Sequence, residues 1–222
     1  MGKRQEIDNN SLSKIIAEKI TEQIITGELQ PGEKIVETVY ADEYGTSRAP
    51  IREALYLLTI EGLVERVPRK GAVVKGYTNF EMYDLLEIRM MLEDLTMRRI
   101  RETGIVVELV DEMEKLIPFM EEAKSHEEYA TLNHQFHSLI VKMSQSEVIM
   151  NMYARLGLPL LTLQTMSFLE ERYILKSLQE HRLIIEMLKI NRFDKAHEIL
   201  QKHNQDVIGR VENTIAEKKR ED

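Results

Sequence analysis

The sequence predicts a mainly α-helical protein in two parts, an N-terminal winged helix-turn-helix and a C-terminal all-α bundle of six or seven helices. Short β-prone runs occur only in the first third of the chain, and the remainder shows the 3.6-residue apolar period of helices. The net charge also differs between these two parts of the chain. Residues 1–76 hold 11 basic and 12 acidic side chains, so residues 77–222 carry −7 of the net charge of −8. We therefore expect two domains, 1–76 and 77–222, with different roles.

The composition excludes several classes of protein. Of the 222 residues, 43% are hydrophobic and 31% are charged, which leaves enough apolar material for a packed core. The chain has no Cys, so disulfides, thiolate metal sites and cysteine nucleophiles are excluded. It has no apolar run of about 18–20 residues, and its polar start MGKRQEIDNN lacks the apolar core of a signal peptide. We expect a cytoplasmic protein with no membrane partner.

The first 76 residues are predicted to alternate short helices with strands. An apolar stripe indicates a helix from Ser11 to Gly27, and Gly45 and Gly62 end two further helices. Ser47 precedes the last of these helices as its expected N-cap. The other expected elements are a strand over 34–36, helices over 37–44 and 48–61, and the strands of a hairpin over 63–67 and 72–74.

Residues from Asn79 onward show only helical patterns. Asn79, Ser146 and Asn191 are the expected N-caps, and Gly104 and Gly157 are the expected stops. The predicted helices span 79–103, 105–123, 127–143, 146–156, 159–173, 175–190 and 192–216. These segments predict the bundle of six or seven helices.

The helix after Gly45 carries residues that suit DNA. Two helices followed by a hairpin are the order of a winged helix-turn-helix, whose second helix enters the major groove. The start of this helix offers Thr46 and Ser47, whose hydroxyl and neighbouring free N–H groups suit a phosphate oxygen. Arg48 and Arg52 lie four residues apart on one face and suit a guanine edge or a phosphate.

The hairpin adds Arg69 and Lys70 at its tip. An alternative is that the two helix arginines only solvate a surface helix, where they pair with Glu53 or Asp42. Because Arg69 and Lys70 of the wing follow the helix arginines in the order of a winged helix-turn-helix, we favour DNA binding.

At these residues the chain resembles the GntR family of bacterial transcription regulators. The match covers about residues 12–75 and is carried by ITGELQPGE (25–33), ADEYGTSRAPIREAL (41–55), EGLV (61–64) and RKG (69–71). The resemblance implies that Ser47, Arg48 and Arg52 reach DNA and that the tip at Lys70-Gly71 touches the minor groove. Regulators of this type often carry an arginine early in the first short helix of the motif, where this chain has Thr38. We therefore expect fewer phosphate contacts or a different operator.

Histidines in the helical part have a spacing that suits a metal site. Asn133 and His137 lie one turn apart on one helical face, and His181 and His203 lie in two later helices. Three imidazoles and an amide oxygen are suitable ligands for a divalent cation inside the bundle. The alternative is that each histidine is an ordinary hydrogen-bonded residue of the core or the surface. We expect the remaining histidines to lie at the surface or beside the ligands: His126, His134 and His197.

Residues from about 78 to 215 resemble the FCD effector domain of the FadR subgroup of the same family. The segments EIR (87–89), LNHQFH (132–137), EH (180–181) and 196–203 follow in the expected order. The metal-binding branch has an acidic residue four before its first His and two later His residues 22 apart, as His181 and His203 are. The resemblance implies a divalent ion, Zn, Ni or Mn, on Asn133, His137, His181 and His203. Because Asn133 stands where Asp is commoner and an amide is neutral, the expected affinity is lower.

Four protein ligands on such an ion leave positions for a small carboxylate effector. We expect Arg89 to be a second contact of this effector through a bidentate guanidinium pair. The alternative for Arg89 is a salt bridge to Glu87 or Glu93. The predicted function is a ligand-responsive transcription regulator, a repressor or activator, that reads a near-palindromic double-stranded DNA operator as a homodimer.

Other functions are compatible with parts of the pattern. One alternative is a regulator of the same class whose metal ion has a purely structural role. Another is a regulator whose helical domain binds an acyl-type effector without metal. A mononuclear metalloenzyme is a remote alternative, because the chain lacks the paired Glu-x-x-His of di-iron bundles and the His-Glu-x-x-His of zinc hydrolases. We predict that the protein is not an enzyme.

Overall fold

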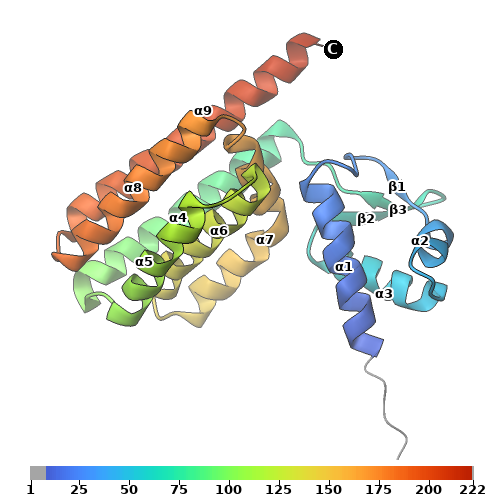
Figure 1. The fold of residues 1–222 in the computed structure, drawn as a ribbon, viewed down its shortest axis with the longest axis horizontal. Helices are drawn as coiled ribbons and strands as arrows, with labels where there is room; N and C mark the ends of the chain where they lie inside the picture. Colours follow the sequence, from blue (N-terminus) through green and yellow to red (C-terminus); the bar gives the residue numbers. More distant parts are fainter. Residues whose placement is uncertain (1–8, 222) are drawn as a thin grey trace, which may run out of the picture. The chain divides into compact units, whose positions relative to one another are not determined.

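Two compact units make up the chain in the computed structural model, which describes residues 9–221, and they divide between Tyr77 and Thr78. Figure 1 shows the helices and strands of each unit. All strands among the described residues belong to the N-terminal unit, and the C-terminal unit is helical. The predicted fold class, a winged helix-turn-helix followed by a helical bundle, is confirmed.

The N-terminal unit is built on the packing of its first helix against its third. Buried Ile16 and Ile20 of the first helix and buried Ile51 and Leu55 of the third form the centre of this core. Burial of each such side chain contributes about 1.5–3 kcal/mol. The elements are α1 (Asn9–Ile25), β1 (Lys34–Ile35), α2 (Glu37–Glu43), α3 (Arg48–Ile60), β2 (Val64–Val67) and β3 (Gly71–Val74).

The three strands form an antiparallel sheet in the order β1-β3-β2. Val67 pairs with Gly71, and the Lys70 N–H donates to the Val67 carbonyl at 3.1 Å, so the hairpin turn is tight. The backbone has positive φ at Arg69 (66°) and at Gly71 (90°), a conformation that glycine adopts without strain. The hairpin therefore forms a short wing whose tip is residues 68–71.

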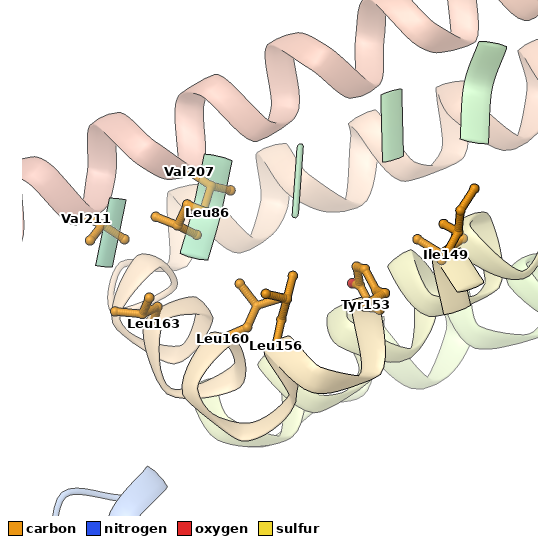
Figure 2. Close-up of a cluster of buried hydrophobic side chains, with 9 residues drawn as sticks. Leu86, Ile149, Tyr153, Leu156, Leu160, Leu163, Val207 and Val211 are labelled. Carbon is orange, nitrogen blue, oxygen red and sulfur yellow. The ribbon is translucent and has the colours of Figure 1, made fainter. Parts of the chain in front are cut away.

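The C-terminal unit is a bundle with a continuous apolar core. Figure 2 shows part of this core, where Tyr153, Leu156 and Leu160 of one helix face Leu86 and Val207 of two others. No helix in the described range combines the length and the apolar character needed to cross a membrane. The helices are α4 (Asn79–Thr103), α5 (Val107–Glu121), α6 (His126–Lys142), α7 (Glu147–Ser167), α8 (Glu171–Lys189) and α9 (Phe193–Glu221).

Two of the three predicted N-caps of this unit are wrong by one residue. Thr78, rather than Asn79, caps α4, and it forms a capping box with Glu81. Asn191 has φ 58° and turns the chain two residues before α9 begins at Phe193. Ser146 caps α7 as predicted, because its hydroxyl accepts from the Ile149 N–H.

Helix α7 bends at Gly157, where φ is 27° and ψ is −124°. The predicted helices over 146–156 and 159–173 are therefore two halves of one bent element. Residues 78–221 contain six helices if α7 is counted as one element and seven if its halves are counted separately. The second half ends at Ser167 rather than at 173. The chain leaves the helix at fully buried Phe168, and α8 begins at Glu171 instead of 175.

Candidate nucleic-acid interface and candidate metal centre

The turn between α2 and α3 presents the start of α3 to solvent. Gly45 has φ 60°, and the N–H of half-buried Thr46 donates to the Ala41 carbonyl at 2.9 Å, which closes the turn. Ser47 lies at the predicted N-cap position with an extended backbone, but its side chain makes no capping hydrogen bond. The exposed hydroxyl and the free N–H groups of the first turn are therefore available to an anion such as a phosphate.

Both arginines of α3 lie in exposed positions. The side chain of Arg52 is 58% exposed, and its Nη2 lies 3.1 Å from Glu37 Oε2 in α2. Arg52 therefore pairs with Glu37, and not with Glu53 or Asp42 as the alternative from the sequence proposed. An exposed ion pair contributes only about 0–1 kcal/mol, so the Arg52 guanidinium can exchange this carboxylate for a phosphate or a base at little cost.

The wing tip carries Arg69, Lys70 and Gly71, all of them exposed. In the view of Figure 1 the hairpin tip and the start of α3 lie at the same edge of the N-terminal unit. A positive loop beside the start of an exposed helix is the geometry with which a winged helix-turn-helix contacts a duplex.

Three helices of the C-terminal unit bring three histidines together. His137 of α6, His181 of α8 and His203 of α9 are fully buried, and each offers a ring nitrogen within 4.8 Å of the other two. Their ring centroids are 4.9–5.3 Å apart. Convergent imidazoles at this spacing are the donor set that a divalent transition metal prefers.

These imidazoles are neutral at physiological pH, as a metal ligand must be. Burial, together with the positive charge of Arg89, lowers the pKa of His137 to about 3. Burial also lowers the pKa of His181 well below its ordinary value, and it lowers that of His203 although Glu180 opposes the shift. No hydrogen-bond partner among the described residues reaches either nitrogen of His181 or the Nε2 atoms of His137 and His203.

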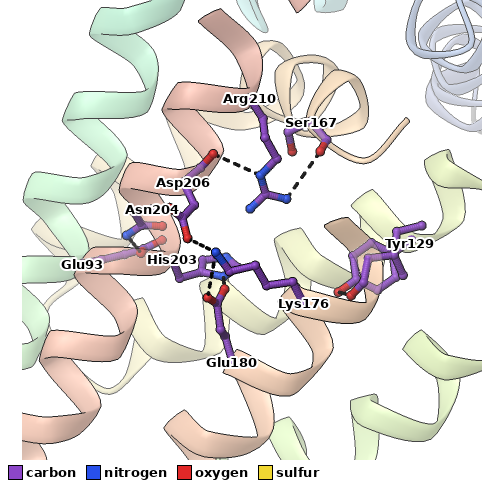
Figure 3. A network of polar contacts seen from close by, with 10 residues as sticks. Glu93, Tyr129, Ser167, Lys176, Glu180, His203, Asn204, Asp206 and Arg210 are labelled. Carbon is purple, nitrogen blue, oxygen red and sulfur yellow. Dashed lines mark hydrogen bonds and ion pairs between the residues drawn. The ribbon is translucent and has the colours of Figure 1, made fainter. Parts of the chain in front are cut away.

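Two carboxylates orient the histidine rings. Nδ1 of His203 lies 2.8 Å from Glu180 Oε2, and this contact is drawn in Figure 3. Nδ1 of His137 lies 3.1 Å from Glu93 Oε1. A carboxylate on one ring nitrogen fixes the tautomer and leaves the other nitrogen as the ligand. Neither glutamate has a sequence signal for this role, because nothing in the spacing of residues 93 and 180 shows which helix each will face.

Asn133 lies one turn before His137 in α6 and is fully buried. Neither its amide oxygen nor its amide nitrogen has a hydrogen-bond partner within the part of the chain that the structure describes. An unpaired buried amide costs about 1–3 kcal/mol, so an occupant that accepts its oxygen as a ligand would offset that cost.

Arg89 is also buried, and it forms the salt bridge that the sequence offered as the alternative to effector binding. Its Nε lies 2.9 Å from Glu93 Oε1. Burial would raise the pKa of Glu93, but Arg89 and His137 outweigh it and hold the pKa below its ordinary value, so this carboxylate stays charged. The second oxygen of Glu93 accepts from the Asn204 amide at 2.7 Å, whereas Arg89 Nη2 makes no hydrogen bond of good geometry to a described residue.

The other histidines with defined contacts lie outside the three-histidine cluster. Nε2 of His197 lies 2.5 Å from Asp94 Oδ1, and its Nδ1 contacts Arg101. The ring of His134 is half-buried and stacks on Tyr153 with 5.5 Å between centroids.

Two family descriptions match the chain. Residues 12–74 match "Bacterial regulatory proteins, gntR family", and residues 84–206 match the "FCD domain". The first match covers α1 to β3, and the second covers the helices that carry the three-histidine cluster.

Relatives of similar length support the same assignment. The gluconate operon transcriptional repressor of Bacillus licheniformis is 29% identical over 206 residues, which is 89% of this chain and 84% of the repressor. The protein of the same name from Bacillus subtilis (strain 168) is 28% identical over 208 residues, again 89% and 84%. These relatives are transcription regulators and not enzymes.

A solved structure shares the fold. A putative GntR transcriptional regulator from Rhodococcus sp. RHA1 superposes with a TM-score of 0.78 at 19% identity, over 91% of this chain and 98% of that one. The exposed start of α3 and the exposed wing agree with the two family matches. The relatives, which are transcription regulators, agree with them as well. The chain belongs to the GntR family of bacterial DNA-binding transcription regulators and carries an FCD domain.

Proposed function

We propose that this regulator is a homodimeric repressor that senses a small carboxylate through a divalent ion in its FCD domain. Asn133, His137, His181 and His203 would hold the ion, and Arg89 would contact the effector. In the N-terminal unit, Thr46, Ser47, Arg48 and Arg52 would contact the operator, with Arg69, Lys70 and Gly71 at the wing. Because it acts on DNA, we place its activity in the cytoplasm.

The observation that carries the proposal is the set of buried, neutral and unpaired ring nitrogens. Each buried polar atom without a partner costs about 1–3 kcal/mol, and several of them meet within 4.8 Å in this core. A protein core retains such a cluster when an occupant satisfies it. The donor set fits Zn, Ni or Mn, because imidazole nitrogens suit all three.

The bound ion would supply a positive charge at which a carboxylate can be recognised. Its protein ligands are neutral, so that charge is compensated only at a distance by Glu93 and Glu180. Arg89 would add a charge-assisted hydrogen bond from Nη2. The names of the gluconate operon repressors support an organic acid as the effector and repression as the outcome.

On DNA, a dimer would place two α3 helices in successive major grooves of a near-palindromic operator, with half-sites about one turn apart. Effector binding would then shift the equilibrium between conformations that fit the operator and conformations that do not.

Elemental analysis of the purified full-length protein tests the proposal. We expect about one equivalent of Zn, Ni or Mn in the wild type. That metal should be lost in His137→Ala and His203→Ala and retained in His126→Ala, a histidine of α6 outside the cluster. A wild-type protein without metal that still senses a ligand would refute the metal centre and support the acyl-type alternative. A protein that contains the ion but binds none of the carboxylates tested would indicate a structural role for the ion.

A further inference from the structure

The three-stranded sheet carries basic side chains behind the tip of the wing as well as on it. Lys34 of β1 and Arg66 of β2 are exposed, like Arg69 and Lys70 of the tip. None of these four side chains forms an ion pair with any residue that the structure describes. Each therefore keeps its positive charge available to an anion from outside the chain.

The strand register places Lys34 and Arg66 close behind the turn of the hairpin. Lys34 pairs with Val73 and Arg66 pairs with Ala72, so both lie within two positions of Gly71. Paired residues of neighbouring strands share a face, and successive residues of one strand point to opposite faces. Because Ala72 and Val73 follow each other in β3, Lys34 and Arg66 lie on opposite faces of the sheet.

The side chain of Lys34 extends toward the wing tip. Its Cε lies 3.9 Å from the position that a Cβ on Gly71 would occupy, so the ammonium group lies beside the turn. Glu65 shares this face, because it also pairs with Val73, but the middle strand β3 lies between the two residues. Lys34 and Glu65, both described by the structure, form no ion pair, and the lysine charge remains beside the tip.

Arg66 lies on the face of the sheet that carries the core of the N-terminal unit. In the same row, Ile35 and Ala72 are buried, at 2% and 6% exposure, whereas Arg66 at the end of the row is exposed. The apolar core thus ends before Arg66, and its guanidinium faces solvent on the side of the wing opposite to Lys34.

Opposite faces of a hairpin suit the two backbones of a duplex. The minor groove is about 6 Å wide, so a hairpin tip that lies in it has a phosphate backbone beside each face. Arginine and lysine are the side chains that most often contact phosphates. The alternative is that both residues only prevent β1 and β2, the edge strands of the sheet, from pairing with another chain.

We propose that Lys34 and Arg66 contact phosphates on the two faces of the wing, one on each strand of the operator. This inference rests on the proposed contact of the wing tip with DNA, and it adds two residues behind that tip. Phosphate contacts carry no base information, so these residues set the affinity and orientation of the wing and leave sequence preference to α3. They also supply backbone contacts to a chain in which Thr38 replaces a common arginine.

The salt dependence of DNA binding by the full-length protein tests the proposal. Fluorescence anisotropy at several salt concentrations gives the slope of log affinity against log salt concentration. We expect Lys34→Met and Arg66→Met each to make this slope shallower by about one, and the double variant by about two, because each phosphate contact contributes about −0.9. Affinity for an operator and for random duplex DNA should fall alike. Lys34→Arg keeps the charge and should retain the wild-type slope, which separates the charge from the packing of the stem.

Lys115→Met is the control, because Lys115 is an exposed lysine of α5 in the C-terminal unit, and it should retain the wild-type slope. Unchanged slopes in both single variants overturn the proposal and favour the protection of edge strands. A change in only one of them, or a double variant no shallower than a single one, also overturns it, because the wing then contacts one backbone only. Lys70→Ala distinguishes these failures from failure of the proposed function. If that variant also keeps the wild-type slope, the wing tip itself does not contact DNA.

Discussion

At the scale of single residues, Arg52 combines exposure with a weak ion pair to Glu37. Its Nη2 lies 3.1 Å from Glu37 Oε2, while more than half of the Arg52 side chain remains exposed to solvent. The carboxylate restricts the rotamers of a long side chain without removing its other N–H groups. Arg52 can therefore present its remaining N–H groups to a planar acceptor pair such as a guanine edge.

Arg52→Ala is expected to weaken operator binding by about 1–3 kcal/mol and to relax sequence preference at one position of each half-site. Fluorescence anisotropy on an operator selected from random duplex DNA measures both effects. Arg192→Ala, an exposed arginine of the C-terminal unit, should bind as the wild type does. Unchanged operator affinity in Arg52→Ala would contradict the assignment of α3 to DNA.

Glu180 is the residue that most directly supports a histidine of the cluster. Glu180→Gln removes the charge that faces His203 Nδ1 and should lower metal affinity about 10–100-fold, as is typical of residues that orient metal ligands. Competition with a chromophoric chelator measures this affinity. Glu186→Gln is the matched control, because Glu186 is an exposed glutamate of the same helix. Equal metal affinity in both variants would show that Glu180 does not orient His203.

Among the elements, α7 contributes much of one core cluster of the bundle and also bends at Gly157. Leu160 follows the bend and is fully buried in the cluster of Figure 2. Leu160→Ala should lower the free energy of unfolding by about 2–5 kcal/mol, because it removes buried methyl groups and leaves a cavity. Urea unfolding followed by circular dichroism measures the loss. Val148→Ala, at a 73% exposed position of the same helix, should cost far less, and equal losses would contradict this core assignment.

The elements of the fold were predictable wherever the sequence carries a local signal. Glycines at 45 and 62 mark the ends of α2 and α3, and the apolar period reveals the helices of the bundle. The break after Ser167 was missed because Phe168 continues the apolar pattern while its ring is inserted in the core. Local periodicity cannot distinguish an apolar residue that ends a helix from one that extends it.

The candidate metal centre was predictable for a different reason. Spacing and resemblance together named His137, His181 and His203, and the bundle brings these residues together. The positions of Glu93 and Glu180 beside His137 and His203 were not predictable, because they depend on which helices pack together. A carboxylate or an amide in a helix has no sequence signal that shows whether it faces solvent or a histidine.

Across the chain, the net charge is unequally divided between the two units. The C-terminal residues hold most of the net charge of −8, so we expect contacts with phosphates at the helix start and the wing of the N-terminal unit. Each phosphate contact contributes about −0.9 to the slope of log affinity against log salt concentration. Lys70→Ala should make this slope shallower by about one and weaken all sequences alike, whereas Lys202→Ala in α9 should leave it unchanged. A slope unaltered by Lys70→Ala would remove the wing from the interface.

If an occupant of the bundle controls the binding of DNA by the N-terminal unit, the affinity for the operator must change when that occupant binds. This change is measured as the operator Kd of the metal-loaded full-length protein, with and without a saturating small carboxylate whose binding has been established by calorimetry. We predict a change in Kd of about 5- to 150-fold, which corresponds to about 1–3 kcal/mol of coupling. The change should disappear in His203→Ala. An operator Kd that stays the same while the ligand is bound would contradict the account.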